Sequence, residues 1–499
     1  MGDPHLLIVG GGLAGLSAGC YARASGFRTT IVEHNLALGG VCTAWPRGPY
    51  VVDGCIHWLT GGPFARLYEE LGVVPRVELR PIERWMTWRD AIDGSMVDVT
   101  RDLARLARDL RALSPDDGEE LARFFEEADH IAELDPGVDR PAEITPLREQ
   151  LHALWEMRSS VKPLVHFRKP LGTWAREHLR SETLRRFFAR LLPEDAPAMM
   201  LLMFLGYLKR GWLSRPAGGT AAFRDAVIDR YRRLGGESVV HATVDEVLVE
   251  NGQACGLRLD DGTILSGDAV LSTSSTPETV LRLLGGRYDA AALRERLQKW
   301  KLFQPIVLAS FGVDDPLSAV PPMLLVDRLA PFRVGNTESN YLYLRVCNDD
   351  PALAPAGHAV VQAMLPTDYT WWATRGAGYE AAKEEVARAA LAQIEHAIPG
   401  IGERVRMTDL ATPLTYWRQT RSWRGAYEGW MPNSDSMFGH VKKKLAGLDR
   451  FYMAGQWVEP GGGVPTAVMS GRKAVQILCA DTARPFQSSL EVRESGGPR

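Results

Sequence analysis

The sequence has few cysteines and no paired cysteine motif. Six cysteines occur among 499 residues, and none forms a Cys-x-x-Cys pair. We therefore expect neither a disulfide framework nor a metal site, and this cysteine usage is typical of proteins in a reducing cytoplasm. Long apolar runs are also missing. The longest, residues 196–208, is shorter than the ~20 residues that a membrane-spanning helix needs.

An excess of charge of one sign is missing as well. Lys and Arg total 58 against 61 Asp and Glu, which leaves a formal net charge of -3. This balance argues against nucleic acid as the main partner. Residues 5–9 already read as a buried strand, which leaves no room for a secretory signal peptide. We expect a cytoplasmic protein, and its oligomeric state stays open.

A β-α-β unit with a glycine-rich turn opens the chain. An apolar strand at 6–9 is followed by Gly10, Gly12 and Gly15, then by a helix and a second strand that ends at Glu33. In this pattern the first glycine permits a tight turn, the second lets backbone approach a pyrophosphate, and the third lets the helix pack on the strand. The helix N-terminus attracts phosphate, and the acid accepts hydrogen bonds from a ribose. The sequence therefore predicts a dinucleotide site for an unphosphorylated ribose, as in FAD or NAD.

The rest of the chain alternates between helical and strand-rich stretches. Amphipathic helical patterns dominate the segment after the first unit, and β-branched strands with hairpin turns follow it. A strand, a glycine-rich loop and a helix then return to the character of the N-terminus. This pattern predicts an α/β fold of the Rossmann type. The expected parts are dinucleotide-binding segments at 1–97, 215–300 and 411–480, a helical insert at 98–214, a mixed α+β substrate domain at 301–410 and a disordered tail at 481–499.

Three segments resemble signatures of the FAD oxidases in the amine-oxidase and phytoene-desaturase superfamily. Residues 38–43 resemble the Gly-Gly segment after the ribose acid, 216–220 resemble the central signature, and 451–472 resemble the terminal flavin-binding motif. The resemblance spans nearly the whole chain and is closest to phytoene desaturases, carotenoid isomerases and retinol-saturase-like enzymes. It implies a two-dinucleotide-binding fold with FAD as the cofactor. Val41 stands where many members have arginine, which puts one charged contact to the FAD phosphates in doubt.

The glycine-rich loop near the C-terminus also has physical features of a flavin site. Its backbone N–H groups can approach a planar ring, and the helix starting near Val464 points its positive end at whatever lies beyond Gly463. That charge would stabilise a reduced flavin and favour hydride acceptance. The residues expected to bind the cofactor are Gly10, Gly12, Leu13, Ala14, Gly15, Glu33, His34, Gly39, Gly40, Val41, His57, Trp58, Val244, Gly455, Gly462, Gly463 and Val464.

His57 is a candidate for proton transfer. It lies in a segment, residues 53–58, that resembles the family segment passing near the flavin ring. The ordinary pKa of histidine lies close to physiological pH, so this side chain could exchange a proton. A histidine that only holds its loop by hydrogen bonds is the commoner situation, and we favour that interpretation here.

A cluster of aromatic residues precedes the C-terminal motif. Its members could line a slot for an apolar substrate, or could only fill an interface between domains. Glu428 lies inside the cluster and could act on a proton, although the sequence does not single it out. The catalytic residues stay unknown, with His57, Tyr427 and Glu428 as candidates. The expected substrate contacts are Tyr416, Trp417, Tyr427 and Trp430.

Residues 199–205 form the most apolar stretch of the chain. A core helix is the commoner explanation for such a run. A lipid tunnel and a membrane-dipping helix are the alternatives, because methionine-rich surfaces adapt to apolar ligands, and Lys209, Arg210 and Arg215 are suited to anionic headgroups. The second alternative predicts peripheral contact with the inner face of a membrane.

The resemblance implies an FAD-dependent enzyme that acts on carbon–carbon double bonds. Its substrate would be a polyene, an isoprenoid or another long apolar lipid, and the reaction would be desaturation, saturation or cis-trans isomerisation. Two alternatives stay open: a flavin amine oxidase, and a non-catalytic FAD-bearing protein that binds prenyl lipids. The sequence does not determine the substrate, the direction of electron flow or the electron acceptor.

Overall fold

A parallel β-sheet made from three distant stretches of the chain forms the centre of one half of the molecule. The computed structural model describes residues 2–134, 137–156, 165–433, 436, 439 and 441–488. All neighbouring strands of this sheet run parallel, as the Rossmann-type prediction requires. The order of its five strands is β10 (Glu237–Val239), β2 (Arg28–Val32), β1 (His5–Val9), β14 (Ala269–Ser272) and β22 (Phe451–Met453).

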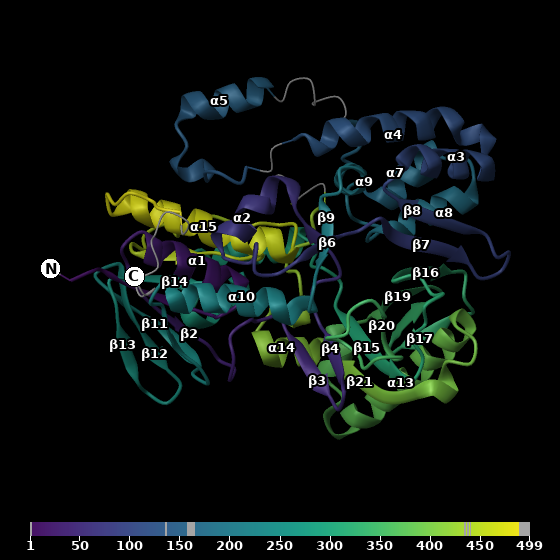
Figure 1. Ribbon diagram of the computed structural model, residues 1–499. Helices are drawn as coiled ribbons and strands as arrows, with labels where there is room; N and C mark the ends of the chain where they lie inside the picture. Colours follow the sequence, from purple (N-terminus) through teal and green to yellow (C-terminus); the bar gives the residue numbers. More distant parts are fainter. Residues whose placement is uncertain are drawn as a thin grey trace, which may run out of the picture.

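Three helices cover one face of this sheet, as Figure 1 shows at the left of the molecule. Small residues let them approach closely. A Cβ atom at Gly471 would lie 2.4 Å from the carbonyl oxygen of Ala14, and one at Gly19 would lie 2.5 Å from the ring of Tyr231. The hydroxyl of Ser17 also donates a hydrogen bond of 2.7 Å to the carbonyl oxygen of Val468. The helices are α1 (Leu13–Ala24), α10 (Gly219–Arg233) and α15 (Gly463–Asp481).

A three-stranded antiparallel sheet covers the other face. It consists of β11 (Val244–Glu250), β12 (Gln253–Leu259) and β13 (Ile264–Ser266). The two predicted hairpins turn at Asn251-Gly252 and at Asp261-Gly262, with φ of +48° at Asn251 and +75° at Gly252 in the first. Strand β1 serves both layers because its side chains alternate: Leu6 and Ile8 pack with the helices, and Leu7 and Val9 pack with the small sheet.

A seven-stranded mixed sheet forms the centre of the other half. Its last two strands, β7 (Arg84–Asp90) and β8 (Met96–Thr100), lie within or across the expected N-terminal cofactor segment, 1–97. The expected boundary at residue 97 is therefore wrong: β7 pairs with β16, more than 230 residues away, and buries Trp85 and Trp88 there. The remaining strands, in order towards β7, are β21 (Val405–Ala411), β15 (Ile306–Val313), β20 (Ala359–Pro366), β19 (Leu342–Cys347) and β16 (Met323–Asp327).

A layer of helices lies beyond β7 and β8, at the upper right of Figure 1. Helix α4 packs on α9, and one hydrophobic core joins these helices to Trp85 and Trp88. The amphipathic patterns predicted the helical character of this layer. Its helices are α3 (Leu103–Leu113), α4 (Gly118–Ala132), α7 (Leu171–His178), α8 (Glu182–Leu191) and α9 (Ala198–Lys209), and α5 (Leu147–Glu156) lies separately at the top of the same view.

Helix α9 contains the most apolar run of the sequence and belongs to the core. Leu201, Leu202 and Leu205 are buried, so they cannot insert into a membrane from this position. The two basic residues that follow are paired with acids: Lys209 with Asp129, and Arg210 with Glu133 at 3.0 Å. The interpretation of this run as a membrane-dipping helix is therefore wrong, and the prediction of a core helix is correct.

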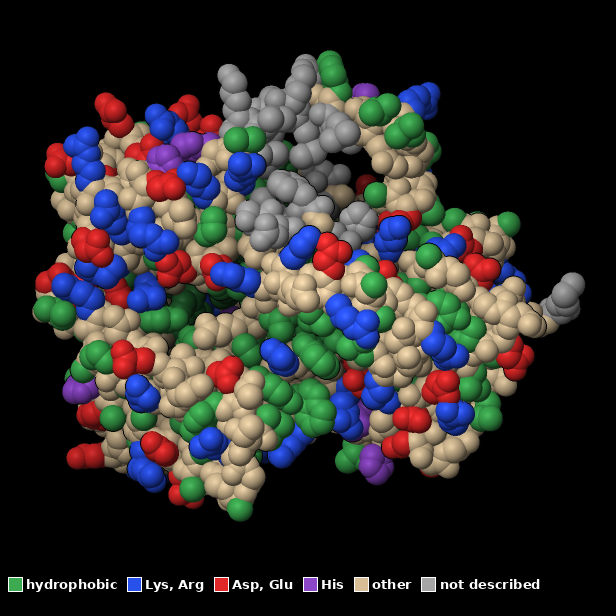
Figure 2. Space-filling model, turned by 180° about the vertical axis from the view of Figure 1, so that it is seen from behind, with side chains coloured by type: hydrophobic (Ala, Val, Ile, Leu, Met, Phe, Trp, Pro, Cys, Tyr) green, Lys and Arg blue, Asp and Glu red, His purple; other side chains and the backbone are tan. Residues whose placement is uncertain are grey.

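Shorter elements connect these layers. They are β3 (Ala44–Arg47), β4 (Tyr50–Asp53), β5 (Leu59–Thr60), α2 (Ala65–Glu70), β6 (Leu79–Pro81), β9 (Leu213–Pro216), α11 (Ala290–Lys299), β17 (Phe332–Val334), β18 (Thr337–Ser339), α12 (Tyr369–Ala373), α13 (Tyr379–Ala397) and α14 (Pro413–Thr420). Among the described residues, no helix combines the length and apolar character needed to cross a membrane. Basic and acidic side chains are interspersed on the face that Figure 2 shows. Most of the tail predicted to be disordered, residues 489–499, lies outside the described residues.

Candidate cofactor and substrate cavity

A large cavity of about 1010 Å³ lies where the parallel sheet, the seven-stranded sheet and the helical layer meet. The carboxyl ends of β1, β2 and β14 open into it, and this edge of a parallel sheet is where open α/β folds bind ligands. Residues from α9 and from β19 line it as well. The cavity therefore joins the predicted dinucleotide site to the apolar helical layer.

Gly12 leaves space that the protein itself does not fill. Its φ of -69° is open to any residue, and a Cβ atom there would meet nothing closer than the Cα of Gly40, at 3.9 Å. Neither backbone strain nor packing therefore accounts for glycine at this position. The gap lies at the N-terminus of α1, where free N–H groups attract phosphate. The residues present fit a dinucleotide pyrophosphate.

Gly15 has a different task from Gly12. A Cβ atom at Gly15 would lie 2.1 Å from the carbonyl oxygen of Gly10, so only glycine lets α1 pack this closely on the turn. It does not line the cavity, whereas the other residues predicted to bind the cofactor all do. Helix α1 begins at Leu13, because Gly12 already occupies the N-cap position.

Glu33 is held at the end of β2 by two backbone groups. Its carboxylate accepts hydrogen bonds from the N–H of Gly11, at 2.7 Å, and from the N–H of Asn35, at 2.9 Å. These contacts orient the carboxylate beside the glycine turn, and Glu33 and His34 both line the cavity. This position suits recognition of ribose hydroxyls.

Residues 38–43, which include Val41, contain no basic side chain, but basic side chains from other parts of the chain line the cavity. Arg282 and Arg421 both line the cavity. Arg282 is engaged by Glu278, at 2.6 Å, whereas Arg421 lies over the ring of Trp417, at 4.9 Å. Arg421 can therefore supply the positive charge that Val41 does not. Sequence reasoning missed it because it lies far along the chain from the glycine turns.

The C-terminal motif forms the opposite wall of the cavity. Gly461, Gly462 and Gly463 all have positive φ, at +129°, +64° and +77°, so the loop bends in a way that other residues rarely adopt. Helix α15 starts directly after it, as predicted, and points its N-terminus at the cavity. The hydroxyl of Ser470 accepts a hydrogen bond of 2.9 Å from the N–H of Gly455, which fixes the other end of the loop.

His57 is half-buried and electrically neutral. Burial, with Arg345 and Arg215 nearby, lowers its pKa to about 3, so the ring carries no extra proton at neutral pH. Arg345 pairs with the buried carboxylate of Asp53, at 3.2 Å, and that carboxylate only partly offsets the lowering of the His57 pKa by burial. The Nε2 atom of His57 makes no hydrogen bond to any of the described residues. His57 lines the cavity but is unsuited to donate a proton, which disfavours it among the three catalytic candidates.

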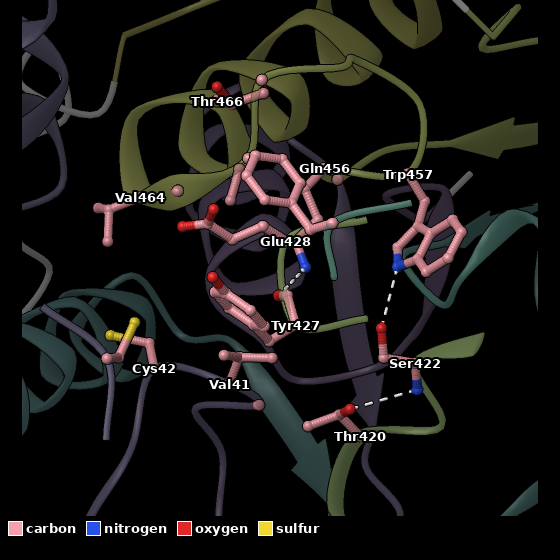
Figure 3. A pocket seen from close by; sticks show the side chains of 18 of the residues that line it. Val41, Cys42, Thr420, Ser422, Tyr427, Glu428, Gln456, Trp457, Val464 and Thr466 are labelled. Carbon is pink, nitrogen blue, oxygen red and sulfur yellow. Dashed lines mark hydrogen bonds between the residues drawn. The ribbon is translucent and has the colours of Figure 1, made fainter. Parts of the chain in front are cut away.

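Glu428 is the carboxyl group that the structure singles out. Its side chain lies against Gly462 of the flavin motif, where a Cβ atom would be 2.7 Å from the Cβ of Glu428. Burial raises its pKa to about 7, and no charged group among the described residues contributes to this shift. In Figure 3 its carboxyl group points to the same side as the hydroxyl of Tyr427, towards Val464. Glu428 can therefore gain or lose a proton near neutral pH at the cavity wall.

The aromatic cluster divides into two groups. Tyr416 and Tyr427 line the cavity, with ring centroids 6.1 Å apart. Gln456 donates a hydrogen bond of 2.6 Å to the carbonyl oxygen of Tyr427, so this wall is tied to the flavin motif (Figure 3). Trp417 and Trp430 do not line the cavity, and their expected role in substrate contact is wrong.

Trp430 supports the flavin loop from behind. It is fully buried, and its indole N–H donates a hydrogen bond of 3.1 Å to the carbonyl oxygen of Trp457. Its ring contacts Trp457 and Trp300 edge to face, at 5.3 and 5.6 Å. Both alternatives that the sequence left open therefore apply, to different residues. Tyr416 and Tyr427 line the cavity, whereas Trp430 packs behind the flavin loop.

The far end of the cavity has a wall of methionine and aromatic side chains, although the charged residues Arg190, Glu194 and Asp195 also line the cavity. Met199, Met200 and Met203 face it from one side of α9, while the leucines of that helix pack into the core. Trp58, at the boundary with the glycine-rich half, contacts Trp85 and Phe204 edge to face. Tyr341 and Tyr343 complete this wall. The arrangement gives a long apolar ligand flexible and aromatic surface on several sides.

Comparison with known proteins gives consistent results. A family model described as flavin containing amine oxidoreductase matches residues 13–479. The chain is 24% identical to a 4,4'-diapolycopene oxygenase of Methylomonas sp, over 96% of this chain and 99% of that protein. It is 25% identical to a neurosporene-forming phytoene desaturase of Cereibacter sphaeroides, over 96% and 95%. An oxidoreductase from Methanosarcina mazei shares the fold, with a TM-score of 0.63, 17% identity and coverage of 95% and 100%.

Proposed function

Because the chain belongs to the flavin-containing amine oxidoreductase family, we propose that it transfers hydrogen between its flavin and the carbon skeleton of a long polyene or related apolar lipid. The protein is an FAD-dependent oxidoreductase with an α/β fold. The substrate class is the part that we propose. The observation that carries it is the continuity of one cavity from the glycine turns to the methionine and aromatic wall.

The relatives support this substrate class. Two of them are named for diapolycopene and for phytoene, which are long polyene or isoprenoid hydrocarbons. Such molecules lack polar groups for recognition, so contact area and shape must position them. The thioether side chains of Met199, Met200 and Met203 adapt to irregular apolar surfaces, which suits a long hydrocarbon.

The reaction transfers a hydride, which carries two electrons, and a proton to two different acceptors. Bound FAD supplies the site that accepts or gives a hydride. In desaturation, one substrate carbon loses a hydride, its neighbour loses a proton, and the electron pair left from that C–H bond forms the new double bond. Glu428 would take this proton, because its carboxyl group faces the cavity and has a pKa of about 7. Saturation would use the same groups in reverse.

Anaerobic mixing of the FAD-loaded protein with phytoene in detergent, with a primary amine and with NADPH tests this proposal. We expect the polyene to reduce the oxidised flavin, or to reoxidise a chemically reduced one, and chromatography should show a product with a changed number or geometry of double bonds. Reduction by the amine alone would favour an amine oxidase. No response to any of the three would leave only a role in lipid binding.

A matched pair of substitutions makes the test specific to the apolar wall. Met203→Glu places a charge in the cavity and should impair reaction with the polyene while FAD content stays normal. Met96→Glu introduces the same change on the surface, where the side chain is 58% exposed, and should leave the reaction unchanged. Equal rates for the two variants would contradict the proposed substrate site.

Peripheral contact with a cytoplasmic membrane surface remains a proposal, and α5 supports it better than α9 does. Leu147, Leu151 and Trp155 repeat every four residues on α5 and are 70%, 58% and 60% exposed. Spacing of this kind makes an apolar stripe on one face of a helix. A lipid substrate also has to be extracted from a membrane. In liposome flotation, Leu151→Asp with Trp155→Asp should abolish binding to anionic vesicles, whereas wild type that never floats would refute the proposal.

A further inference from the structure

A cluster of two histidines and one glutamate lies in the helical layer, away from the cofactor and substrate cavity. Glu120 is in the first turn of α4, His166 precedes α7, and His178 is the last residue of α7. Each offers one donor atom, and the three atoms all lie within 4.8 Å of one another. The Oε1 atom of Glu120 is 3.4 Å from Nε2 of His166 and 3.8 Å from Nδ1 of His178.

We propose that Glu120, His166 and His178 bind one divalent transition-metal cation, with Zn²⁺ as the best fit. Two imidazoles with one carboxylate are a donor set that zinc uses in proteins. Bonds of ~2.1 Å to a tetrahedral ion put neighbouring donor atoms ~3.4 Å apart. The two distances to Glu120 are already close to this value, and the distance between the two histidine donor atoms is no more than 4.8 Å, so a shift of at most ~1.4 Å would complete the site.

The backbone around the cluster is fixed before any cation binds. Asp117, at the start of α4, accepts hydrogen bonds from the N–H groups of Arg180, at 2.6 Å, and Ser181, at 3.0 Å. This contact holds the end of α7 against the start of α4. The carbonyl oxygen of Phe167 accepts a hydrogen bond of 2.9 Å from the N–H of Met199, which anchors the segment with His166. The three donors are therefore brought together by structure outside the cluster.

One of the two carboxylate oxygens of Glu120 is paired with an arginine, and the other faces the two histidines, where a cation would bind. Arg123 pairs with the Oε2 atom of Glu120, at 2.8 Å, so Oε1 is the oxygen that both histidines approach. Lys169 is paired with Glu177, at 2.5 Å. The stacked ring of Trp174 restricts His178 from one side. A metal would thus meet a partly neutralised carboxylate and two imidazoles with restricted orientations.

The site would remain open to solvent, and a bound cation would stabilise the position of α9, which lines the cavity. The side chains of His166, His178 and Glu120 are 32%, 28% and 13% exposed, which leaves room for water as a fourth ligand. Because α4 packs on α9, a cation that joins α4 to α7 would hold the helix that carries Met199 and Met203. The proposed metal is therefore structural and has no part in hydrogen transfer.

Titration of the tag-free, FAD-loaded and chelator-treated protein with Co²⁺ tests the proposal, because this ion reports tetrahedral coordination by visible absorption. We expect one Co²⁺ per chain, displaced by Zn²⁺. His178→Gln and His166→Gln should each weaken Co²⁺ affinity at least ~10-fold. His396→Gln, at an exposed position on α13, is the control and should keep wild-type affinity.

Several outcomes would overturn the proposal. They are no stoichiometric absorption in wild type, unchanged affinity in the two histidine variants, or equal loss in the His396 control. A second measurement covers the case in which a variant fails to fold. In wild type, Zn²⁺ should protect His166 and His178, but not His396, from acylation by diethyl pyrocarbonate, read by peptide mass spectrometry. Equal acylation with and without Zn²⁺ would also refute the site.

Discussion

Replacing Glu428 by glutamine is the most informative perturbation of the cavity. The amide keeps the shape of the side chain against Gly462 but cannot exchange a proton. If Glu428 moves the substrate proton, the variant should retain FAD and lose ~10²–10⁴-fold in the rate of substrate-driven flavin reduction. The wild-type rate should also change with pH around about 7, the pKa that burial gives this carboxyl group, and the variant should lack that inflection.

The same burial predicts a change in stability. Glu428 has a folded-state pKa of about 7 against an ordinary value of 4.5, so the unfolded chain releases this proton first as pH rises. The free energy of unfolding of the wild type should therefore fall between pH ~4.5 and ~7, by about 3 kcal/mol from this group, and level off above. Glu428→Gln removes the fall, so the variant should become relatively more stable at alkaline pH.

Glu459 provides the matched control. It is also buried, but Lys443 and Lys473 lie 2.7 and 3.5 Å away and hold its pKa below the ordinary value despite the cost of burial. Glu459→Gln should therefore destabilise the protein at neutral pH and approach wild type in acid. Denaturant unfolding of the FAD-loaded proteins from pH 4 to 9 compares the two variants.

Two results would refute the reasoning about Glu428. One is a wild-type stability profile that is parallel to that of Glu428→Gln over the whole pH range, because it would mean that the carboxyl group titrates as an exposed one. The other is full activity of the variant with an unchanged pH inflection. The first result would mean that burial does not raise the pKa of Glu428. The second would mean that another group, or water, takes the substrate proton.

The remaining predictions concern the cofactor and its support. Gly12→Val should abolish FAD binding, since the added side chain would fill the gap between Gly12 and Gly40; normal flavin absorbance in the purified variant would contradict this. Glu33→Ala should weaken FAD by ~1–3 kcal/mol in an equilibrium titration. Acid precipitation should release free flavin from the wild type, and colour left in the pellet would show a covalent bond. Trp430→Ala should lower stability by ~3–5 kcal/mol, measured by denaturation, because it leaves a cavity behind the flavin loop. Tyr427→Ala should instead slow substrate-driven flavin reduction with FAD content intact.

The sequence alone determined the dinucleotide half of the fold. The strand at 5–9, the glycine turn and α1 are neighbours along the chain, so short-range rules on turns, helix starts and apolar runs apply to them directly. The strands with hairpin turns that the sequence predicts after the helical insert are observed as β11, β12 and β13 for the same reason. Each of these elements carries its own pattern of alternating or continuous apolar residues.

Only the tertiary structure decided which side chains meet in the cavity. Tyr427 lines it and Trp430 does not, although both are aromatic and three residues apart, because the chain between them turns at Gly429. Glu428 acquires its raised pKa from burial by distant parts of the chain, and Glu120, His166 and His178 meet through the packing of α4 on the segment around α7. The pairing of β7 with β16 likewise joins segments more than 230 residues apart. The pattern of residues within one segment carries no information about such contacts, because they depend on loop closure and on packing between distant segments.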